Sequence, residues 1–326
     1  MSQWIYNASI VIRSIGERTE SLCRELVLAQ GIPENNLYVV HQSPFSAAMK
    51  KSFQTGIEVG LPWTFCVDAD VLLRDGSIEK MLRFAEEQDV NVCEIQGFVL
   101  DKFFGGPREA GNHLYRTSLL PKVIEQIPEE GVNIRPEFHT LESMKKKGYP
   151  YKQIPVLVGL HDFEQFFSDI YRKCFVQAHK HIKHTDLFLE VWRAGAATDP
   201  DYQVALKGFS AGIEHFSKVY IDVNQEIFKN VKNLTFAEKP RNLTISDIGL
   251  DQIEKIINNW VEPDIYNEKF PNKRGLIPDR KKHLSLEDIK SKVQKIPRIK
   301  RIPFIIGSTL VLMGDRLQRW AKNNDI

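Results

Sequence analysis

The sequence has little cysteine: four residues in a chain of 326, none of them in a C-x-x-C pair. They are scattered through apolar segments, which suits reduced, buried thiols better than disulfides or a structural zinc site. The first residues also lack a basic region followed by an apolar stretch and a small-residue cleavage site, so we expect no secretory signal. Both absences favour a reducing setting, and we expect a cytoplasmic protein. The cysteines are Cys23, Cys66, Cys93 and Cys174.

An excess of charge of either sign is also missing. Forty-four Lys and Arg residues face forty-two Asp and Glu residues, which leaves a formal net charge of +2. No global basic field therefore exists to hold a nucleic acid, and any anion site must be local. With 42% hydrophobic and 26% charged residues, the composition is that of a soluble globular protein and excludes wholesale disorder.

No apolar run is long enough to cross a bilayer, which takes about 20 residues. The nearest candidate, 302–313, contains a glycine and follows the segment 292–301, which holds five basic residues and no acidic one. We interpret the tail 292–326 as a terminal helix packed on the rest of the protein with a solvated basic face. The alternative is a peripheral contact with the inner face of an anionic membrane, or with the acceptor.

Up to residue 165 the chain alternates between short β-branched apolar runs and stretches of helical periodicity. This alternation predicts an α/β fold, with a Rossmann-like, mostly parallel sheet and helices on both faces. Beyond it the alternation stops, so we expect a mainly helical region over 166–326. The expected strands are 10–15, 37–40, 63–67, 90–99 and 154–160, and the expected helices are 17–30, 46–59, one from 77, 119–127, 140–147 and 163–184; the stretch 105–112 is expected to be a loop.

Two acidic residues follow the third expected strand. Only Ala69 separates Asp68 from Asp70, so in an extended chain the two-residue period points both carboxylates to the same side. Open α/β sheets bind their ligands at the carboxyl ends of the strands. Neighbouring carboxylates repel each other, which a divalent cation offsets, and oxygen ligands favour Mg²⁺ or Mn²⁺. The alternative is that both are polar residues leaving a strand.

A histidine ends the last expected strand. His161 follows the apolar run 154–160 directly. The same sheet edge would bring its imidazole near Asp68 and Asp70, and imidazole is a suitable ligand for Mn²⁺. The alternative is a histidine that is satisfied by other partners in the interior or at the surface.

A resemblance to a known family is carried by the strand 10–15, the following Gly16 to Thr19, and the run 63–72 with its Asp-x-Asp (DXD) motif. With these segments the chain resembles the GT-A-fold, nucleotide-sugar-dependent glycosyltransferases and is similar to glycosyltransferase family 2. The later part of the chain resembles the same family in the order of its motifs. An acidic residue at the start of a helix, Glu137, is followed by Gly148-Tyr149 and then by His161. The resemblance covers about residues 8 to 165.

The resemblance implies a metal-dependent transfer of a sugar from a nucleoside-diphosphate sugar to a glycan, lipid-linked or small acceptor, as in polysaccharide biosynthesis. It implies that Asp70 binds the metal directly, that Asp68 reaches the ribose or a metal-bound water, and that His161 completes the metal ligands. For an inverting enzyme, it implies that Glu137 is the base that deprotonates the acceptor. A carboxylate that interacts with the helix dipole is the alternative for Glu137.

Further binding residues are expected around the same site. Four residues at the first strand–helix junction are expected to bind the nucleotide, and the alternatives for them are a helix cap and surface ion pairs. Lys50 is expected to meet the diphosphate, and the alternative for it is a solvated lysine. The loop 105–109, with Asn112, His113 and Arg116, is a candidate for part of the sugar or acceptor pocket, and an ordinary turn followed by a surface helix is the alternative. The basic and histidine-rich stretch 179–184 is interpreted as a cationic helix end. The candidates for the nucleotide base and ribose are Arg13, Ser14, Glu17 and Arg18.

Two other functions stay open. A nucleotidyltransferase shares the sheet and the metal, although no Gly-rich phosphate loop follows the first strand. A catalytically silent module of the same fold would bind or position a polysaccharide-assembly complex at a membrane. The retention of Asp68, Asp70 and His161 argues against the silent module.

Overall fold

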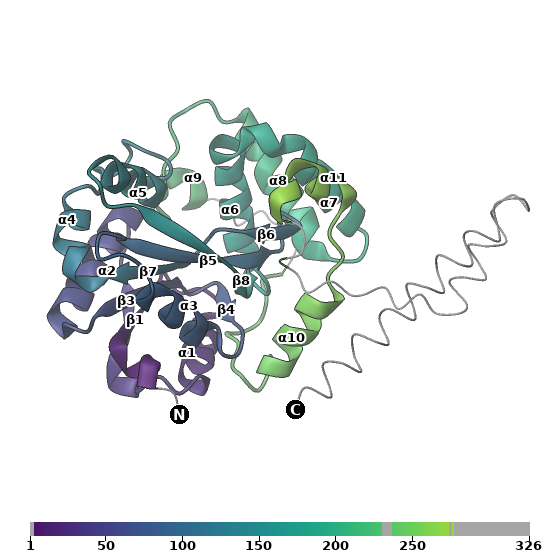
Figure 1. Cartoon of the computed structure of the whole chain (residues 1–326). Coiled ribbons are helices and arrows are strands. Elements are labelled where there is room, and N and C mark those ends of the chain that lie inside the picture. Colours follow the sequence, from purple (N-terminus) through teal and green to yellow (C-terminus); the bar gives the residue numbers. More distant parts are fainter. Residues whose placement is uncertain (1–2, 230–236, 274–275, 277–326) are drawn as a thin grey trace, which may run out of the picture. The chain divides into compact units, whose positions relative to one another are not determined.

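The computed structural model describes residues 3–229, 237–273 and 276 (Figure 1). The described residues all belong to the first of two units of the chain, residues 1–277. The basic and apolar tail 292–326 lies outside the described residues. Within those residues, no helix has the length and apolar character needed to cross a membrane.

A mixed sheet with the strand order β2-β1-β3-β7-β5-β8-β4 forms the centre of the first unit, and β6 pairs with β5 outside this path. The pairs β1–β2, β1–β3 and β5–β8 are parallel, whereas β7 runs antiparallel between β3 and β5. The predicted α/β class with a mostly parallel core is therefore confirmed. The strands are β1 Ala8–Ser14, β2 Leu37–His41, β3 Trp63–Asp68, β4 Val71–Leu73, β5 Glu94–Asp101, β6 Gly106–Arg108, β7 Asn112–Arg116 and β8 Tyr151–His161.

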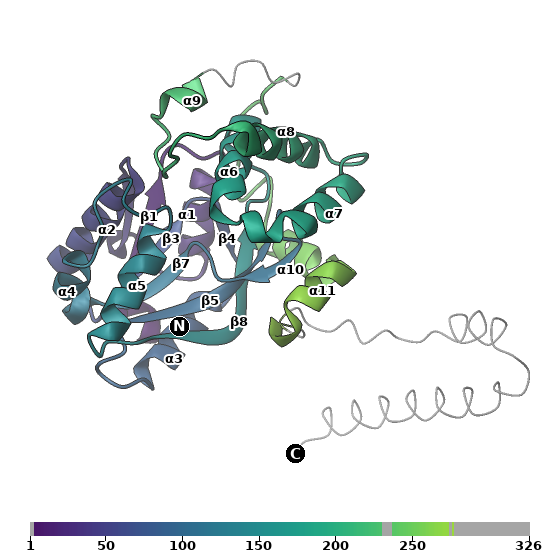
Figure 2. The ribbon, with the colours of Figure 1, turned by 90° about the horizontal axis from the view of Figure 1, so that it is seen from above.

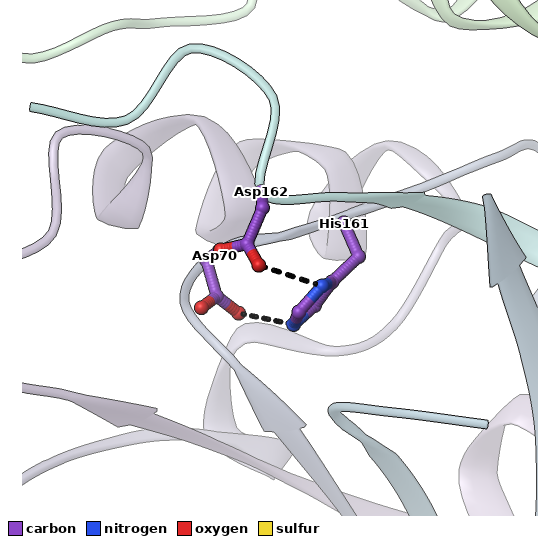
Figure 3. A group of neighbouring side chains, drawn as sticks. All are labelled: Asp70, His161 and Asp162. Carbon is purple, nitrogen blue, oxygen red and sulfur yellow. Dashed lines mark ion pairs between the residues drawn. The ribbon is translucent and has the colours of Figure 1, made fainter. Parts of the chain in front are cut away.

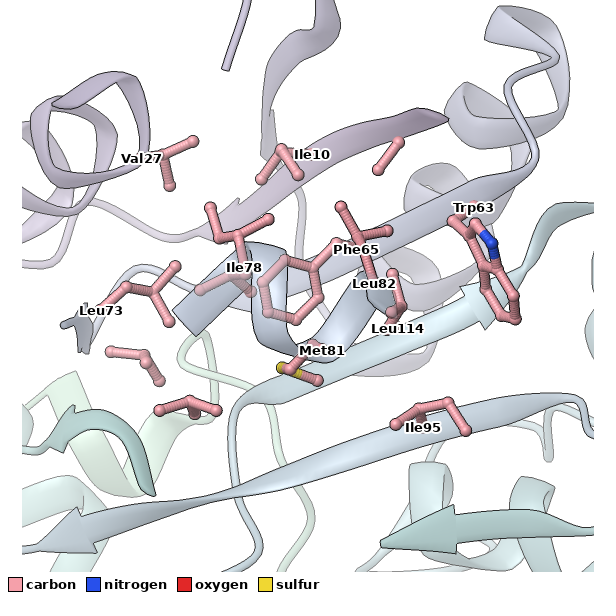
Figure 4. Close-up of a cluster of buried hydrophobic side chains, with 14 of the residues drawn as sticks. Ile10, Val27, Trp63, Phe65, Leu73, Ile78, Met81, Leu82, Ile95 and Leu114 are labelled. Carbon is pink, nitrogen blue, oxygen red and sulfur yellow. The ribbon is translucent and has the colours of Figure 1, made fainter. Parts of the chain in front are cut away.

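Helices cover both faces of this sheet, as the alternation in β1 requires. Ile10 and Ile12 pack with α1 and α3 in one core cluster, whereas Val11 packs with α2, α4 and α5 in another. Figure 4 shows the first cluster, in which Phe65 from β3 lies against Ile78 of α3. The helices are α1 Glu20–Ala29, α2 Phe45–Val59, α3 Ser77–Glu86, α4 Leu120–Ile124, α5 Pro136–Lys146, α6 Phe167–Lys180, α7 Thr185–Gly195, α8 Pro200–Glu214, α9 Glu226–Lys229, α10 Leu250–Asn259 and α11 Asp264–Lys269.

The described chain after residue 165 is helical. Helices α6, α7 and α8 form a third core cluster, which also takes in Phe103 and Phe104 from the turn after β5 (Figure 2). The indole of Trp192 in α7 donates a hydrogen bond to the carbonyl of Phe103, at 2.8 Å. These contacts join the helices to the sheet, and a functional division at residue 165 stays a prediction.

The sequence pattern did not predict three short strands, β4, β6 and β7. Residues 105–112, expected as a loop from their Gly and Pro content, hold β6 and the start of β7. Pro107 is tolerated in β6 because that strand has a neighbour on one side only. The chain also turns after Asp68 instead of staying extended, so Asp70 lies in the turn between β3 and β4. The two carboxylates of the Asp-x-Asp motif therefore take different partners.

Candidate functional site

A cavity of about 560 Å³ lies at the carboxyl ends of the strands. Arg13 from β1, Asp68 from β3 and His161 from β8 line it, as open α/β sheets predict for a ligand site. Helices α5 and α6 contribute further walls, with Glu137 and Lys173 among the lining residues. Most of the predicted site residues thus meet at one cavity.

Asp70 and His161 are brought together by the pairing of β4 with β8, in which Val71 lies opposite His161. The Oδ1 atom of Asp70 lies 3.6 Å from Nε2 of His161 (Figure 3). This oxygen is buried and has no hydrogen-bond partner among the described residues. A buried carboxylate oxygen without a donor is costly, which marks the gap between the two side chains as a place for a cation.

The imidazole of His161 is oriented by acidic neighbours. Its Nδ1 atom lies 2.8 Å from Oδ2 of Asp101 and 3.1 Å from Oδ2 of Asp162. The backbone N–H groups of Phe103 and Phe104 donate to Oδ1 of Asp101 and fix that carboxylate. With Nδ1 held by Asp101, Nε2 is the ring nitrogen that faces Asp70, and it would bind a cation in place of its proton, an arrangement typical of metal-bound histidines.

Asp162 completes the group. The carboxylate oxygens of Asp70 and Asp162 and a ring nitrogen of His161 all lie within 4.8 Å of one another. Asp162 adopts a left-handed backbone conformation, with φ of +63°, directly after β8. Two carboxylates and one imidazole form a donor set that suits Mn²⁺ or Mg²⁺. The chemistry of these residues therefore fits the metal that the resemblance implies.

A lysine compensates the charge of this group. The Nζ atom of Lys173 in α6 contacts Oδ2 of Asp70 and lies 2.5 Å from Oδ1 of Asp162. Burial lowers the pKa of His161, but Asp162, Asp70 and Asp101 outweigh it and raise the pKa to about 10. Burial raises the pKa of Asp162, but His161 and Lys173 outweigh it and lower that pKa. Asp162 is thus held ionised beside buried cations.

Asp68 takes a different partner. Its Oδ1 atom accepts a hydrogen bond of 2.7 Å from Nε of Arg13, whose Nη1 donates to Oε1 of Glu137 at 2.8 Å. The Arg13 guanidinium also lies over the ring of Phe45, at 5.0 Å. Asp68 lines the same cavity as Asp70 but is not one of the three clustered ligand candidates.

Glu137 is held by several donors at once. Its Oε1 atom also accepts a hydrogen bond from the hydroxyl of Tyr115, at 2.9 Å, and Nε2 of His113 lies 2.9 Å from its Oε2. Burial raises the pKa of Glu137, but Arg13 and His113 outweigh it and hold the pKa well below its usual range. A carboxylate with so low a pKa is a weak base until these contacts change, and the role of Glu137 as the base stays a prediction.

The remaining predicted residues divide into two pairs. Ser14 and Glu17 line the cavity, where the Ser14 hydroxyl donates to Oε2 of Glu17 at 2.8 Å. Arg18 lies outside the cavity lining and binds the carbonyl of Arg241, at 2.9 Å. Lys50 is exposed on α2 and does not line the cavity either.

His113 gives the fold a pH dependence that can be measured. Burial lowers its pKa, but Glu137 and Glu94 outweigh it and raise the pKa to about 9. A raised histidine pKa stabilises the fold fully below about pH 6.5, the ordinary value, and this contribution disappears as the pH rises through about 9. We expect the free energy of unfolding, measured with urea, to fall between pH 6.5 and 9.

In the His113→Gln variant, the free energy of unfolding should fall less steeply between pH 6.5 and 9. The remaining decline comes from His161. Substitution of the exposed His41 of β2 by glutamine is the matched control and should keep the wild-type slope. Equal slopes for all three proteins would contradict the assignment of the titration to His113.

Comparisons with known proteins add likenesses of fold. No protein-family model matches the chain, and no curated protein matches it. A glycosyltransferase involved in the glycosylation of the major capsid of PBCV-1 is 16% identical, with 45% of this chain and 80% of that one covered and a TM-score of 0.33. The mannosyltransferase PcManGT from Pyrobaculum calidifontis, solved with GDP-Man and Mn²⁺, is 12% identical, with 64% and 80% covered and a TM-score of 0.35.

A third solved structure, from Desulfovibrio desulfuricans G20, is assigned as a nucleotide-diphospho-sugar transferase. It is 13% identical, with 60% of this chain and 98% of that one covered and a TM-score of 0.34. Glycosyltransferases are thus among the structures that this chain resembles, as the sequence predicts.

Sequence reasoning did not identify three residues of the site. Asp162 is adjacent to His161 in the sequence, and this adjacency could have identified it as a site residue. A turn after a strand can direct the side chain of the next residue toward the same site. Lys173 lies in an aromatic-rich helix, where nothing in the pattern separates it from a surface lysine. Asp101 ends β5 as His161 ends the parallel strand β8, and Asp101 is paired with His161 in register.

Proposed function

We propose that this protein is a metal-dependent glycosyltransferase that uses a nucleoside-diphosphate sugar. The observation that carries the proposal is the cluster of Asp70, His161 and Asp162 at the carboxyl edge of the sheet, with an unpartnered carboxylate oxygen facing the imidazole. The sequence resemblance to GT-A enzymes agrees with a diphosphate ligand at this place.

In this function Asp70, His161 and Asp162 hold Mn²⁺ or Mg²⁺, which neutralises the charge that develops on the departing diphosphate. Asp101 fixes the ring of His161, and Arg13 fixes Asp68 on the wall next to Ser14 and Glu17. The acceptor hydroxyl oxygen forms a bond to the anomeric carbon while the bond to the diphosphate oxygen breaks, its electron pair staying with the diphosphate. The hydroxyl proton passes to a base, for which Glu137 in the cavity wall stays the predicted candidate.

The test is calorimetry with the full chain. Mn²⁺ is titrated first, and then UDP-, GDP- and dTDP-sugars are titrated with and without Mn²⁺. We expect one nucleotide to bind at least about tenfold more tightly with the metal, and its sugar to be released in a hydrolysis screen. Absence of metal-dependent binding across the whole panel would contradict the proposal.

Lys173 favours a second candidate, a silent module that binds a nucleotide sugar without a metal. Its ammonium already pairs with Asp70 and Asp162, as a cation in the site would. This candidate predicts nucleotide binding that is the same with and without Mn²⁺, and no release of sugar. The same titrations therefore separate the two functions.

A further inference from the structure

A group of cations on the cavity wall has no role among the metal candidates. Arg108 in β6, Arg135 before α5 and Lys180 at the end of α6 all line the cavity. Arg108 has an ion-pair partner, Asp101, at 3.0 Å from its Nε, and lies over the ring of Phe104 at 4.3 Å. Among the described residues, no carboxylate forms an ion pair with Arg135 or Lys180. We call Arg108, Arg135 and Lys180 the basic wall.

The members of the basic wall repel one another. Burial, with Arg108 and Arg135 nearby, lowers the pKa of Lys180 to about 7. Burial and Arg108 likewise lower the pKa of Arg135. The acids that act on Lys180, Asp68 and Glu137, are both already paired with Arg13. Without a ligand, Arg135 and Lys180 therefore line the cavity with no carboxylate in an ion pair with either of them among the described residues.

The helix dipole explains only part of this arrangement. A lysine at the C-terminus of α6 is favoured by the dipole. Arg108 and Arg135, however, come from a strand and from the start of another helix, so the dipole of α6 does not account for them. Three elements thus bring guanidinium and ammonium groups to one cavity, which is the donor chemistry that binds phosphate.

Lys180 lies at some distance from the metal candidates, whereas Arg108 pairs with Asp101, which also contacts His161. Lys173, which contacts Asp70, and Lys180 are seven residues apart on α6, and a rise of 1.5 Å per residue separates them by about 10 Å along the axis. Val176 and Gln177 line the cavity between them. A space of this length accommodates about one sugar ring. An anion at Lys180 is therefore distinct from a diphosphate at Asp70 and His161.

We propose that Arg108, Arg135 and Lys180 form a second anion site, which binds a phosphate group carried by the acceptor. The assignment to the acceptor rests on the proposed function, because a donor at the metal side leaves this part of the cavity for the other substrate. The phosphate anchors the acceptor while its hydroxyl points toward the metal side. A sugar phosphate and a lipid-linked phosphate present the same group.

The experiment compares matched probes on the full chain by calorimetry, with Mn²⁺ and nucleotide present and again in buffer alone. Glucose 6-phosphate is compared with glucose, and farnesyl phosphate with farnesol in detergent. We expect the phosphate-bearing member of at least one pair to bind about tenfold or more tightly, and less tightly as ionic strength rises. A larger preference in the first pair points to a sugar phosphate, and in the second to a lipid phosphate.

Variants test the residues themselves. Arg135→Gln and Lys180→Gln should each reduce the preference for phosphate about tenfold, since a hydrogen bond to a charged group is worth about 1.5–3 kcal/mol. Arg135→Lys keeps the charge and should retain most of the preference. The control, Lys80→Gln on α3, changes an exposed lysine outside the cavity and should bind as wild type does. The unfolding midpoint of each variant is measured first.

Equal affinities within both pairs, or an unchanged preference in both glutamine variants, would overturn the second anion site. Failure of the proposed function looks different, since it would abolish metal-dependent nucleotide binding. Phosphate binding that depends on Lys180 but occurs without any nucleotide binding would overturn the acceptor assignment alone. Nucleotide binding with no preference for phosphate would overturn the anion site and leave the proposed function standing.

Discussion

Replacing Asp70 by asparagine should lower the affinity of the protein for Mn²⁺ by about 100-fold or more. The substitution removes the charge of one of the three clustered ligand candidates while keeping the shape of the side chain. Loss of a direct ligand exceeds the roughly 10- to 100-fold effect of changing residues that only orient a ligand. Titration of Mn²⁺, followed by calorimetry or by the signal of free Mn²⁺ in electron paramagnetic resonance, measures the affinity.

The matched control for this variant is Asp75→Asn, since Asp75 is an exposed carboxylate in the turn before α3. Its affinity for Mn²⁺ should equal that of the wild type. Asp70 also pairs with Lys173, so the unfolding midpoint of the Asp70→Asn protein is measured to show that it is folded. A folded variant that still binds Mn²⁺ as the wild type does would exclude Asp70 as a ligand.

Substitution of Arg13 by methionine should lower the free energy of unfolding by about 3–5 kcal/mol. The Arg13 side chain is 2% exposed and bridges the carboxylates of Asp68 and Glu137. Removing one member of a buried ion network leaves the other charges uncompensated, which has an effect of this size. Urea unfolding at neutral pH, followed by circular dichroism, measures the loss.

Arg24→Met is the comparison for the Arg13 variant. Arg24 pairs with Glu34, but its side chain is 41% exposed, and surface pairs contribute about 0–1 kcal/mol. The two variants remove the same chemical group from ion pairs of different burial. Losses of similar size in both would show that the Arg13 network adds little to the stability of the fold.

The sequence predicted the first half of the fold because local patterns determine it there. The strand at β1 has β-branched residues whose alternate side chains reach two different clusters, and this period of two is visible without coordinates. The positions of Asp70 and His161 followed from the rule that parallel strands present their carboxyl ends at one edge. The structure does bring these two side chains together.

The partners of these side chains were not predictable from local patterns. Arg13 and Glu137 are 124 residues apart, and which carboxylate the guanidinium meets depends on how α5 packs against the sheet. Likewise, Asp68 and Asp70 separate because the chain turns between β3 and β4, whereas their spacing suits an extended strand equally well. Long-range packing and a single turn thus decided the contacts that matter most for the chemistry.

Lys173 comes from α6, which follows the sheet in the sequence, and this limits where the chain can be truncated. A recombinant fragment that ends at residue 165 would keep Asp70, His161 and Asp162 but would lose the ammonium that contacts both aspartates. It would also uncover Phe103 and Phe104, which are packed in the cluster of α6, α7 and α8. Truncation at the point where the sequence pattern changes would therefore yield an aggregation-prone product, so structural work on the part of the chain that holds the sheet should retain the helices that follow it.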